Sequence, residues 1–283
     1  MFSQRITRRM QHWWGPPWPG RRGVRDAVHR LRERRIFHHR DDPDEAWRCC
    51  DLWQRNLINK WNSREFAACH GCLLPELYWH GRDPAAAPLE SLPEEFVIRA
   101  VRSPSKESVH VVSRGRELLR GEPASPRQLR ERLPRAGIMR RPVMHLFEEF
   151  ARSEDGGRGL PPNYKCHTFG GHVAAVYHVE SVGLGERRQR YYTPDWQPFD
   201  DRMNTFMPEA ELREPPGCLE EMVRLAGRMG AELGTYMRID FFATERGCMF
   251  NEFSSVPLGA RHNTAYCDEL FGTLWAEHVP DST

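Results

Sequence analysis

The chain has 283 residues, 39% of them apolar and 11% aromatic, so it can bury a core as one large domain or two to three smaller lobes. A formal net charge of +2 gives no indication of a nucleic-acid partner. No apolar run approaches the roughly 18 residues of a membrane span, and residues 1–22 lack the apolar core of a signal peptide. We expect a cytoplasmic protein, and its mean hydropathy of −0.69 predicts much solvated surface.

The first 56 residues are rich in Arg and Trp and are expected to form a helical extension. Residues 24–37 place apolar side chains at helical spacing beside an Arg-rich face. That face could contact acidic phosphates or lipid headgroups, but a solvated face packed on the main body is the interpretation we favour. A second helix is expected after Pro43, with Asp42 as its cap. A third, near residues 59–71, would end at Gly71.

The eight cysteines do not suggest a disulfide scaffold in a chain of this length. Cys69 and Cys72 form one CxxC motif, with His70 between them. A zinc site would need a second pair at matching spacing, and none is evident. We therefore interpret these residues as buried thiols rather than as a metal or redox site.

The rest of the chain alternates strand patterns with helix patterns. Predicted strands are residues 96–101, 109–113 and 143–150, and predicted helices are residues 125–133, 219–233 and 266–279. Residues 164–179 read as a hairpin with Gly170 and Gly171 as a two-residue turn. Residues 151–163 form a Gly- and Pro-rich loop, and residues 181–215 are polar and irregular, which predicts a long functional or mobile loop.

A second hairpin is predicted over residues 237–254, with Glu245-Arg246-Gly247 as a three-residue loop and Gly247 at positive φ. The predicted pairs are Thr244 with Cys248, Phe242 with Phe250, Asp240 with Glu252, and Arg238 with Ser254. The other face would carry a core of Met237, Ile239, Phe241, Ala243, Met249 and Phe253, with Asn251 as a polar exception.

Two facing carboxylates destabilise a sheet unless something compensates for their repulsion. One of the two acids could have a raised pKa, or a hard cation such as Mg²⁺ could lie between Asp240 and Glu252. The alternative is a solvent-facing hairpin whose acids are simply hydrated. A second bias is that only Lys60, Lys106 and Lys165 are lysines among 41 cations. This is either chance or an indication of phosphate contacts.

These motifs together resemble the TupA-like branch of the ATP-grasp family, which is associated with teichuronopeptide and polysaccharide biosynthesis. The sequences MRIDFF and MFNEFSSVPLG resemble the metal-binding end of that fold. In the same order, NKWNSREFAACHG, LPEEFVIRAV, RSPSKES, FEEFA, NYKCHTFGGHVAAV and YYTPDWQPF resemble its other segments. The resemblance covers about residues 57–272. It implies an α+β ATP-grasp fold in which two α+β lobes grip a nucleotide, preceded by the basic helical N-terminal extension.

The resemblance also implies a division of the chain. Residues 1–56 would be the extension, 57–92 a leading helix and its connection, 93–151 the nucleotide lobe, and 152–283 the metal and substrate lobe. The implied cofactors are ATP and Mg²⁺. The implied metal ligands are Asp240, Glu252 and Ser254, and Arg238 would stabilise the transferred phosphoryl group or acyl phosphate. The implied nucleotide contacts are Lys60, Arg99, Ser103, Ser105, Lys106, Glu148, Glu149, Phe150, Ala151 and Lys165, with the backbone of Glu149 and Ala151 holding adenine.

Three departures from the family pattern concern the same site. Ser254 stands where Asn is usual, Arg99 stands where Lys is usual, and loop 102–108 has no glycine and contains Pro104. Glycines in such a loop normally let backbone N–H groups approach phosphate. Weaker metal or nucleotide binding, or contacts made by side chains of the loop, would follow.

The function implied is that of an ATP-dependent carboxylate–amine ligase, which forms an amide through an acyl phosphate from small-molecule substrates. The alternatives are a kinase acting on a small molecule or sugar, and a catalytically degenerate nucleotide-binding module. His262, Asn263 and loop 181–215 are expected on the acceptor side, with 151–162 and 181–215 as lids and the backbone of 257–259 near the oxyanion. An oligomer, or peripheral membrane contact through the basic N-terminus, is possible.

Overall fold

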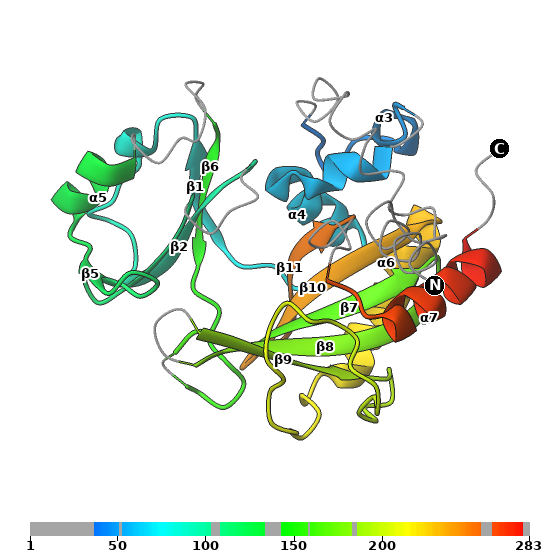
Figure 1. Ribbon diagram of the computed structural model, residues 1–283. Coiled ribbons are helices and arrows are strands. Elements are labelled where there is room, and N and C mark those ends of the chain that lie inside the picture. The colour runs from blue at the N-terminus through cyan, green and yellow to red at the C-terminus, as the bar shows by residue number, and fades with distance from the viewer. Residues whose placement is uncertain are drawn as a thin grey trace, which may run out of the picture.

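The computed structural model describes residues 37–50, 53–102, 108–133, 143–157, 159–182, 186–255 and 262–279, without the side chains of residues 181 and 182. The helix expected at residues 24–37 lies outside this range except for its last residue. Two antiparallel sheets form two lobes, each with its own helices (Figure 1). The predicted α+β class is therefore confirmed. No helix of the described residues is long and apolar enough to cross a membrane.

The first sheet has six strands in the order β1-β6-β2-β3-β4-β5. Their bounds are β1 Leu77–Gly81, β6 His145–Glu149, β2 Glu95–Ala100, β3 Val109–Ser113, β4 Arg116–Glu117 and β5 Glu122–Pro123. Helix α5 (Pro126–Arg132) begins with a capping box at Ser125, and the short 3-10 helix η4 spans Pro84–Ala86. One face buries Phe96, Ile98 and Phe147 against Leu129 of α5. The opposite face carries Val97 and Arg99 and is free to form part of a site.

The second sheet has five strands in the order β11-β10-β7-β8-β9. Their bounds are β11 Gly247–Ser254, β10 Tyr236–Thr244, β7 Asn163–Phe169, β8 His172–Val182 and β9 Glu186–Tyr192. Helix α6 (Leu219–Leu233) buries Met222, Leu225 and Met229 in the core of this lobe. Helix α7 (Ala265–His278) places Phe271 against the rings of His167 and Phe169.

Within the described residues, three short helices precede the first strand: α3 (Asp44–Trp47), the 3-10 helix η3 (Trp53–Ile58) and α4 (Lys60–Cys69). Asn59 caps α4, because its side chain accepts a hydrogen bond from the Trp61 N–H. The Lys60 N–H donates to the carbonyl oxygen of Val101, 3.0 Å away, just after β2. Helix α4 also packs against β11, so it connects the two lobes.

Most predicted elements are confirmed, including the hairpin with Gly170 and Gly171 at its turn. The predicted cap of α3 is wrong: Pro43 is at the cap position, and the Asp42 carboxylate accepts a hydrogen bond from the His39 N–H instead. The loop predicted over 181–215 is also wrong at its start, because β9 pairs with β8 along its whole length. The interpretation of the CxxC motif holds for Cys72, which is buried, but Cys69 is exposed.

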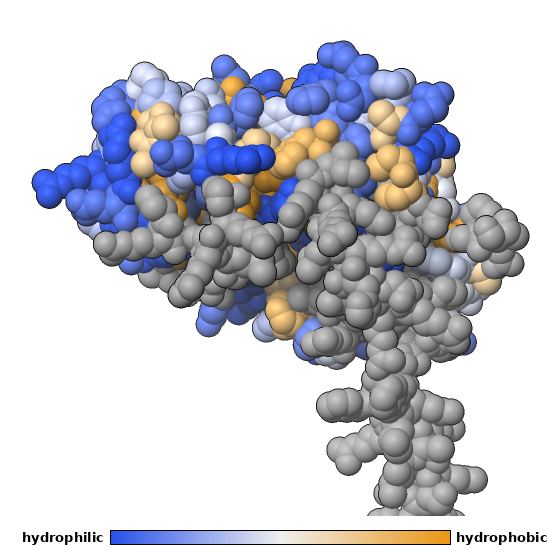
Figure 2. All heavy atoms as spheres, turned by 90° about the horizontal axis from the view of Figure 1, so that it is seen from above, coloured by the Kyte–Doolittle hydropathy of each residue, from blue (hydrophilic) through white to orange (hydrophobic). Residues whose placement is uncertain are grey.

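The surface agrees with the low mean hydropathy. Seen from above, the described residues show mostly hydrophilic side chains with small hydrophobic groups between them (Figure 2). Among the described residues, the exposed large apolar side chains are Phe206, Leu212 and Tyr266. Single exposed apolar side chains are common on protein surfaces and do not indicate a binding site. The polar residues between the lobes are therefore the candidates for a functional site.

Candidate active site

The hairpin of β10 and β11 reaches the predicted pairing by a different route. The turn has two residues rather than three, because Thr244 pairs with Gly247 and Phe241 pairs with Phe250. An extra residue between Phe250 and Glu252 then shifts the register by one. Asp240 consequently faces Glu252 and Arg238 faces Ser254, as predicted. The predicted pairs Thr244 with Cys248 and Phe242 with Phe250 are wrong.

The extra residue is Asn251, the polar side chain that did not fit the predicted core face. The bulge at Asn251 also reverses the faces on which Met249 and Phe250 were predicted to lie. Phe250 lies in the core, whereas Met249, predicted for the core face, pairs with Phe242 and lines a pocket at the lobe junction. A single polar residue within an apolar face is therefore a sequence signal for a bulge.

Asp240 is the centre of the charged cluster. Its side chain is 0% exposed, and Arg238 donates to both of its oxygens, from Nε at 2.7 Å and from Nη2 at 2.8 Å. Lys165 lies directly opposite Asp240 in the pairing of β7 with β10, and its Nζ donates to Asp240 Oδ2. Burial and the adjacent Arg238 lower the pKa of Lys165, against the opposing effect of Asp240. Two buried cations thus balance this one carboxylate.

Glu252 faces more positive than negative charge. Its Oε2 lies 3.6 Å from Lys60 Nζ, and its Oε1 lies 3.8 Å from Arg238 Nη2. Burial by itself would raise its pKa, but Lys60, Lys165, Arg238 and Arg99 together lower the pKa of Glu252 to about 2. A raised pKa on this acid, one of the alternatives from the sequence, is therefore wrong.

Arg99 joins the first sheet to the hairpin of the second. Its Nε donates to Glu148 Oε2 at 2.7 Å, and its Nη1 donates to the side-chain oxygen of Asn251 at 2.8 Å. Glu148 is fully buried and also accepts from Arg64 Nη1 at 3.1 Å. Arg64 and Asn251 are site residues that the sequence reasoning missed. The polar bulge was the only signal for Asn251, and no sequence signal pointed to Arg64.

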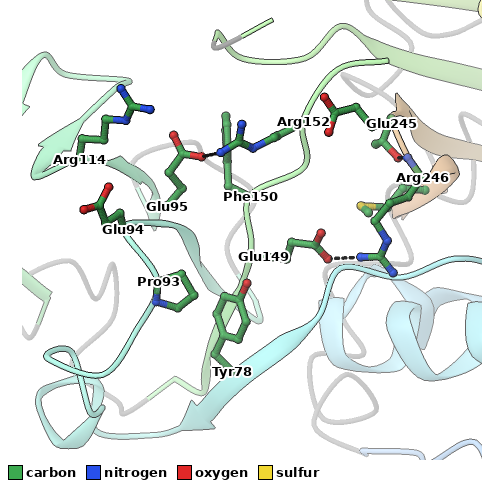
Figure 3. Close-up of a pocket in the computed structure, with 12 residues that line it drawn as sticks. Tyr78, Pro93, Glu94, Glu95, Arg114, Glu149, Phe150, Arg152, Glu245 and Arg246 are labelled. Atoms are coloured by element: carbon green, nitrogen blue, oxygen red, sulfur yellow. Dashed lines mark hydrogen bonds and ion pairs between the residues drawn. The ribbon is translucent and has the colours of Figure 1, made fainter. Parts of the chain in front are cut away.

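Two residues of the segment 149–151, predicted to hold adenine, line a pocket of about 320 Å³ between the lobes (Figure 3). Glu149 and Phe150 are in its wall, and Arg246 from the hairpin turn donates to Glu149 Oε2 at 2.5 Å. The Glu149 N–H donates to the Glu76 carbonyl oxygen at 2.8 Å, so in this structure that group is already paired. Ala151 is buried beside them. The described lining of the pocket includes none of Lys165, Arg238, Asp240 or Glu252, and Glu148 directly precedes Glu149 in the chain.

The remaining predicted residues divide into two groups. Ser103, Ser105, Lys106 and the backbone of 257–259 lie outside the described residues. On the acceptor side, Asn204 forms a β-bridge with Asn263, and the Thr205 N–H donates to the His262 carbonyl oxygen at 2.8 Å. The structure thus brings part of the predicted loop next to residues 262–264.

The oxygen donors of the cluster suit Mg²⁺. Asp240, Glu252 and the hydroxyl of Ser254 are hard ligands, and Mg²⁺ is commonly held by only one or two carboxylates. Glu252 is 31% exposed, and its distances to Lys60 and Arg238 exceed hydrogen-bond length, which leaves its oxygens available. Asp240 accepts three hydrogen bonds and has capacity for one more contact. No group of three or more His, Cys, Asp or Glu side chains that could hold a metal occurs in the described part of the chain.

Sequence comparison finds a known family that this part of the chain resembles. Residues 154–275 match the model of the TupA-like ATP-grasp family. The matched segment contains Lys165, Arg238, Asp240, Glu252 and Ser254, so the predicted ATP-grasp fold is confirmed for the lobe that carries the cluster. No curated protein matches the sequence.

Solved structures with a similar chain path include D-alanine–D-alanine ligase from Bacillus anthracis complexed with ATP, at 12% identity and a TM-score of 0.49. The ATP-grasp ligase PsnB, complexed with a precursor variant, Mg and ADP, has 13% identity and a TM-score of 0.47. The similarity covers 79% of this chain and 66% of the first structure, and 80% of this chain and 60% of the second. The chain therefore spans under two thirds of their length.

Proposed function

We propose that the protein is an ATP-dependent ligase that joins a carboxylate to an amine and releases ADP and phosphate. The observation that carries the proposal is the row of Glu252, Asp240 and Lys165 across three neighbouring strands, with Arg238 hydrogen-bonded to Asp240. Opposed carboxylates within a ring of cations are the arrangement that a metal-bound polyphosphate needs. The TupA-like ATP-grasp match over the same residues supports this interpretation.

The cations supply the binding of the polyphosphate. Lys60 from α4, Arg99 from β2 and Lys165 from β7 reach the same cluster from three different elements. Ammonium and guanidinium groups on separate elements can surround a chain of phosphates and fix its position. We assign adenine to the pocket at the lobe junction, between Phe150 and Met249. Lys106, Ser103 and Ser105 remain predicted contacts from loop 102–108.

Asp240, Glu252 and Ser254 would hold Mg²⁺, which when bound supplies positive charge against the phosphate oxygens during phosphoryl transfer. Arg238 keeps its charge at all relevant pH values: burial lowers its pKa, but Asp240 and Tyr177 raise it well above the ordinary value. Its Nη1 lies 3.4 Å from the Tyr177 hydroxyl, so the guanidinium is held on both sides. It is therefore oriented in advance to stabilise the transferred group.

Two steps complete the proposed reaction. A substrate carboxylate attacks the γ-phosphorus, which gives an acyl phosphate and ADP. The amine then attacks the acyl carbon, and phosphate leaves as the amide forms. Residues 204–205 and 262–263 would bound the acceptor side, and segments 151–162 and 193–215 would exclude water from the acyl phosphate. A role in cell-surface polymer or natural-product biosynthesis follows from the family resemblance.

The test is ADP release with a panel of carboxylates, first alone and then with amines. The ligase proposal expects amide formation that depends on both substrates, and loss of turnover in the double variant Asp240→Asn, Glu252→Gln. The double variant Glu131→Gln, Glu277→Gln removes the same charge from two exposed positions outside the proposed site and serves as the charge-matched control. ADP release that yields a phosphorylated hydroxyl compound would make the protein a kinase instead. Absence of thermal stabilisation by Mg·ATP would refute nucleotide binding itself.

A further inference from the structure

Strand β9 adds residues to the same face of the second sheet that carries the cluster. Lys165 pairs with Tyr177 of β8, and Tyr177 pairs with Tyr191 of β9. Directly opposed residues share a face, and so do residues two apart along a strand. Arg187, four residues before Tyr191, therefore lies on the face of Lys165 and Asp240. The sequence had placed it in a loop.

Arg187 differs from the other cations of the cluster in having no hydrogen-bond or ion-pair partner among the described residues. Lys165 and Arg238 bond to Asp240, and Arg99 bonds to Glu148. The side chain of Arg187 is half-buried, and its Nε is buried without a hydrogen-bond partner. Among the described residues, no carboxylate forms an ion pair with it. Burying half of a guanidinium without a counter-charge costs free energy, unless a bound ligand supplies the missing hydrogen bonds and charge.

The electrostatics agree with this placement. Burial lowers the pKa of Arg187, and the charged group that opposes this effect is Glu252 of the cluster, four strands away in the sheet order. Glu252 pairs directly with Asp240 and so lies on the same face of the sheet.

The cluster as a whole has an excess of positive charge. Six cations face three carboxylates: Lys60, Arg64, Arg99, Lys165, Arg187 and Arg238 against Glu148, Asp240 and Glu252. An excess of three charges in a partly buried site is stabilised by a ligand with several negative charges. A diphosphate or triphosphate fits this requirement better than a single carboxylate does.

We infer that Arg187 is a polyphosphate-binding residue of this site, and that it donates to a phosphate oxygen when the ligand is bound. The inference rests on the proposed function in one respect: it takes the polyphosphate to be the phosphate chain of the bound nucleotide. Arg187 would complete the site from its far edge, opposite Lys60 and Arg99. Because its partner is the ligand, removing it should weaken binding without weakening the fold.

The experiment measures calorimetric binding of two probes, inorganic tripolyphosphate and Mg·ATP, to the full chain. The variants are Arg187→Gln, Arg187→Lys and the control Arg188→Gln, which changes the same charge on the next residue of β9, facing the other side of the sheet. We expect Arg187→Gln to weaken both probes by about tenfold, Arg187→Lys by less, and Arg188→Gln not at all. The thermal midpoint of the ligand-free Arg187→Gln protein should be unchanged or higher.

Each outcome bears on one of the two proposals. Arg187-dependent binding of tripolyphosphate without binding of Mg·ATP would sustain the inference and refute the nucleotide ligase. Normal Mg·ATP binding by Arg187→Gln would overturn the inference and leave the proposed function standing. Failure of the unmodified protein to bind either probe would overturn both. Equal weakening of binding in Arg188→Gln would also overturn the inference, because the effect would then come from overall charge. A lower thermal midpoint in Arg187→Gln alone would overturn it too, because the effect would then be structural.

Discussion

For the neutralisation of Glu252, the sequence and the structure predict opposite effects on stability. If two opposed acids simply repelled each other, Glu252→Gln would relieve that repulsion and stabilise the protein. The structure instead surrounds Glu252 with Lys60, Arg238 and other cations, which hold its pKa at about 2 rather than the ordinary 4.5. The variant should therefore be less stable than the unmodified protein at neutral pH.

The magnitude follows from the two pKa values. The difference between 4.5 and about 2 corresponds to about 3.4 kcal/mol in favour of the charged form, and partial exposure of the side chain reduces this to about 2 kcal/mol. Because the pKa is lower in the folded state, this contribution is complete above about pH 4.5. It is lost as the pH falls toward 2. Glu252→Gln imitates the protonated state, so the difference between the two proteins should shrink over the same interval.

The assay is urea unfolding of the unmodified protein and Glu252→Gln at several pH values between 3 and 7. Glu211→Gln, an exposed site, provides the control and should change the free energy of unfolding by less than about 0.5 kcal/mol. An unfolding free energy for Glu252→Gln equal to or above that of the unmodified protein at pH 7 would refute the electrostatic account of the cluster.

Three further predictions concern packing, the link between the lobes and the metal. Gly230→Ala in α6 should cost about 3 kcal/mol or more by urea unfolding, although Ala favours helices, because its Cβ would lie 2.2 Å from the Gly170 carbonyl oxygen. Asn251→Ala should cost about 1–2 kcal/mol in the same assay, because Arg99 loses its side-chain partner on β11 and keeps only the longer contact, 3.3 Å, to the Asn251 carbonyl oxygen. Ser254→Asn should lower the Mg²⁺ concentration for half-maximal nucleotide binding, since an amide oxygen is the usual family ligand.

Each of these has a matched control. Gly227→Ala in the same helix would place its Cβ 3.2 Å from the Gly171 oxygen and should cost clearly less than Gly230→Ala. Asn263→Ala removes an amide whose hydrogen bond, to Asp268, lies within one lobe, and it should cost less than Asn251→Ala, which cuts a link between the lobes. Ser254→Ala should raise the Mg²⁺ requirement. Equal costs within either pair, or an unchanged Mg²⁺ requirement in both Ser254 variants, would count against the geometry described.

Local sequence patterns were sufficient for most elements and for the central pair of acids. Gly247 marks the turn, and the predicted three-residue loop brings Asp240 opposite Glu252; the structure reaches the same pair with a two-residue turn and the bulge at Asn251. Strand β9 escaped prediction because its charged residues have little intrinsic preference for strands. Its formation depends on pairing with β8, a contact that a local pattern does not contain.

The surroundings of the acids were less predictable because they depend on strand order. Lys165 reaches Asp240 only because β7 lies next to β10, although the two residues are 75 positions apart. The same holds for Arg99, which the resemblance implied as a phosphate contact and which the structure pairs with Glu148 and Asn251. Residue type suggested which groups matter, while the balance of charge among them follows from the tertiary arrangement.

The bulge at Asn251 also determines where the chain length of the hairpin can change. Without this residue, Phe250 and Glu252 would be consecutive, and every other pair between β10 and β11 would remain as it is. A deletion elsewhere in β11 would exchange the core and cleft faces of all residues beyond it. Position 251 is therefore the point within this strand at which a single-residue deletion leaves both faces in place. What such a deletion removes is the connection to Arg99.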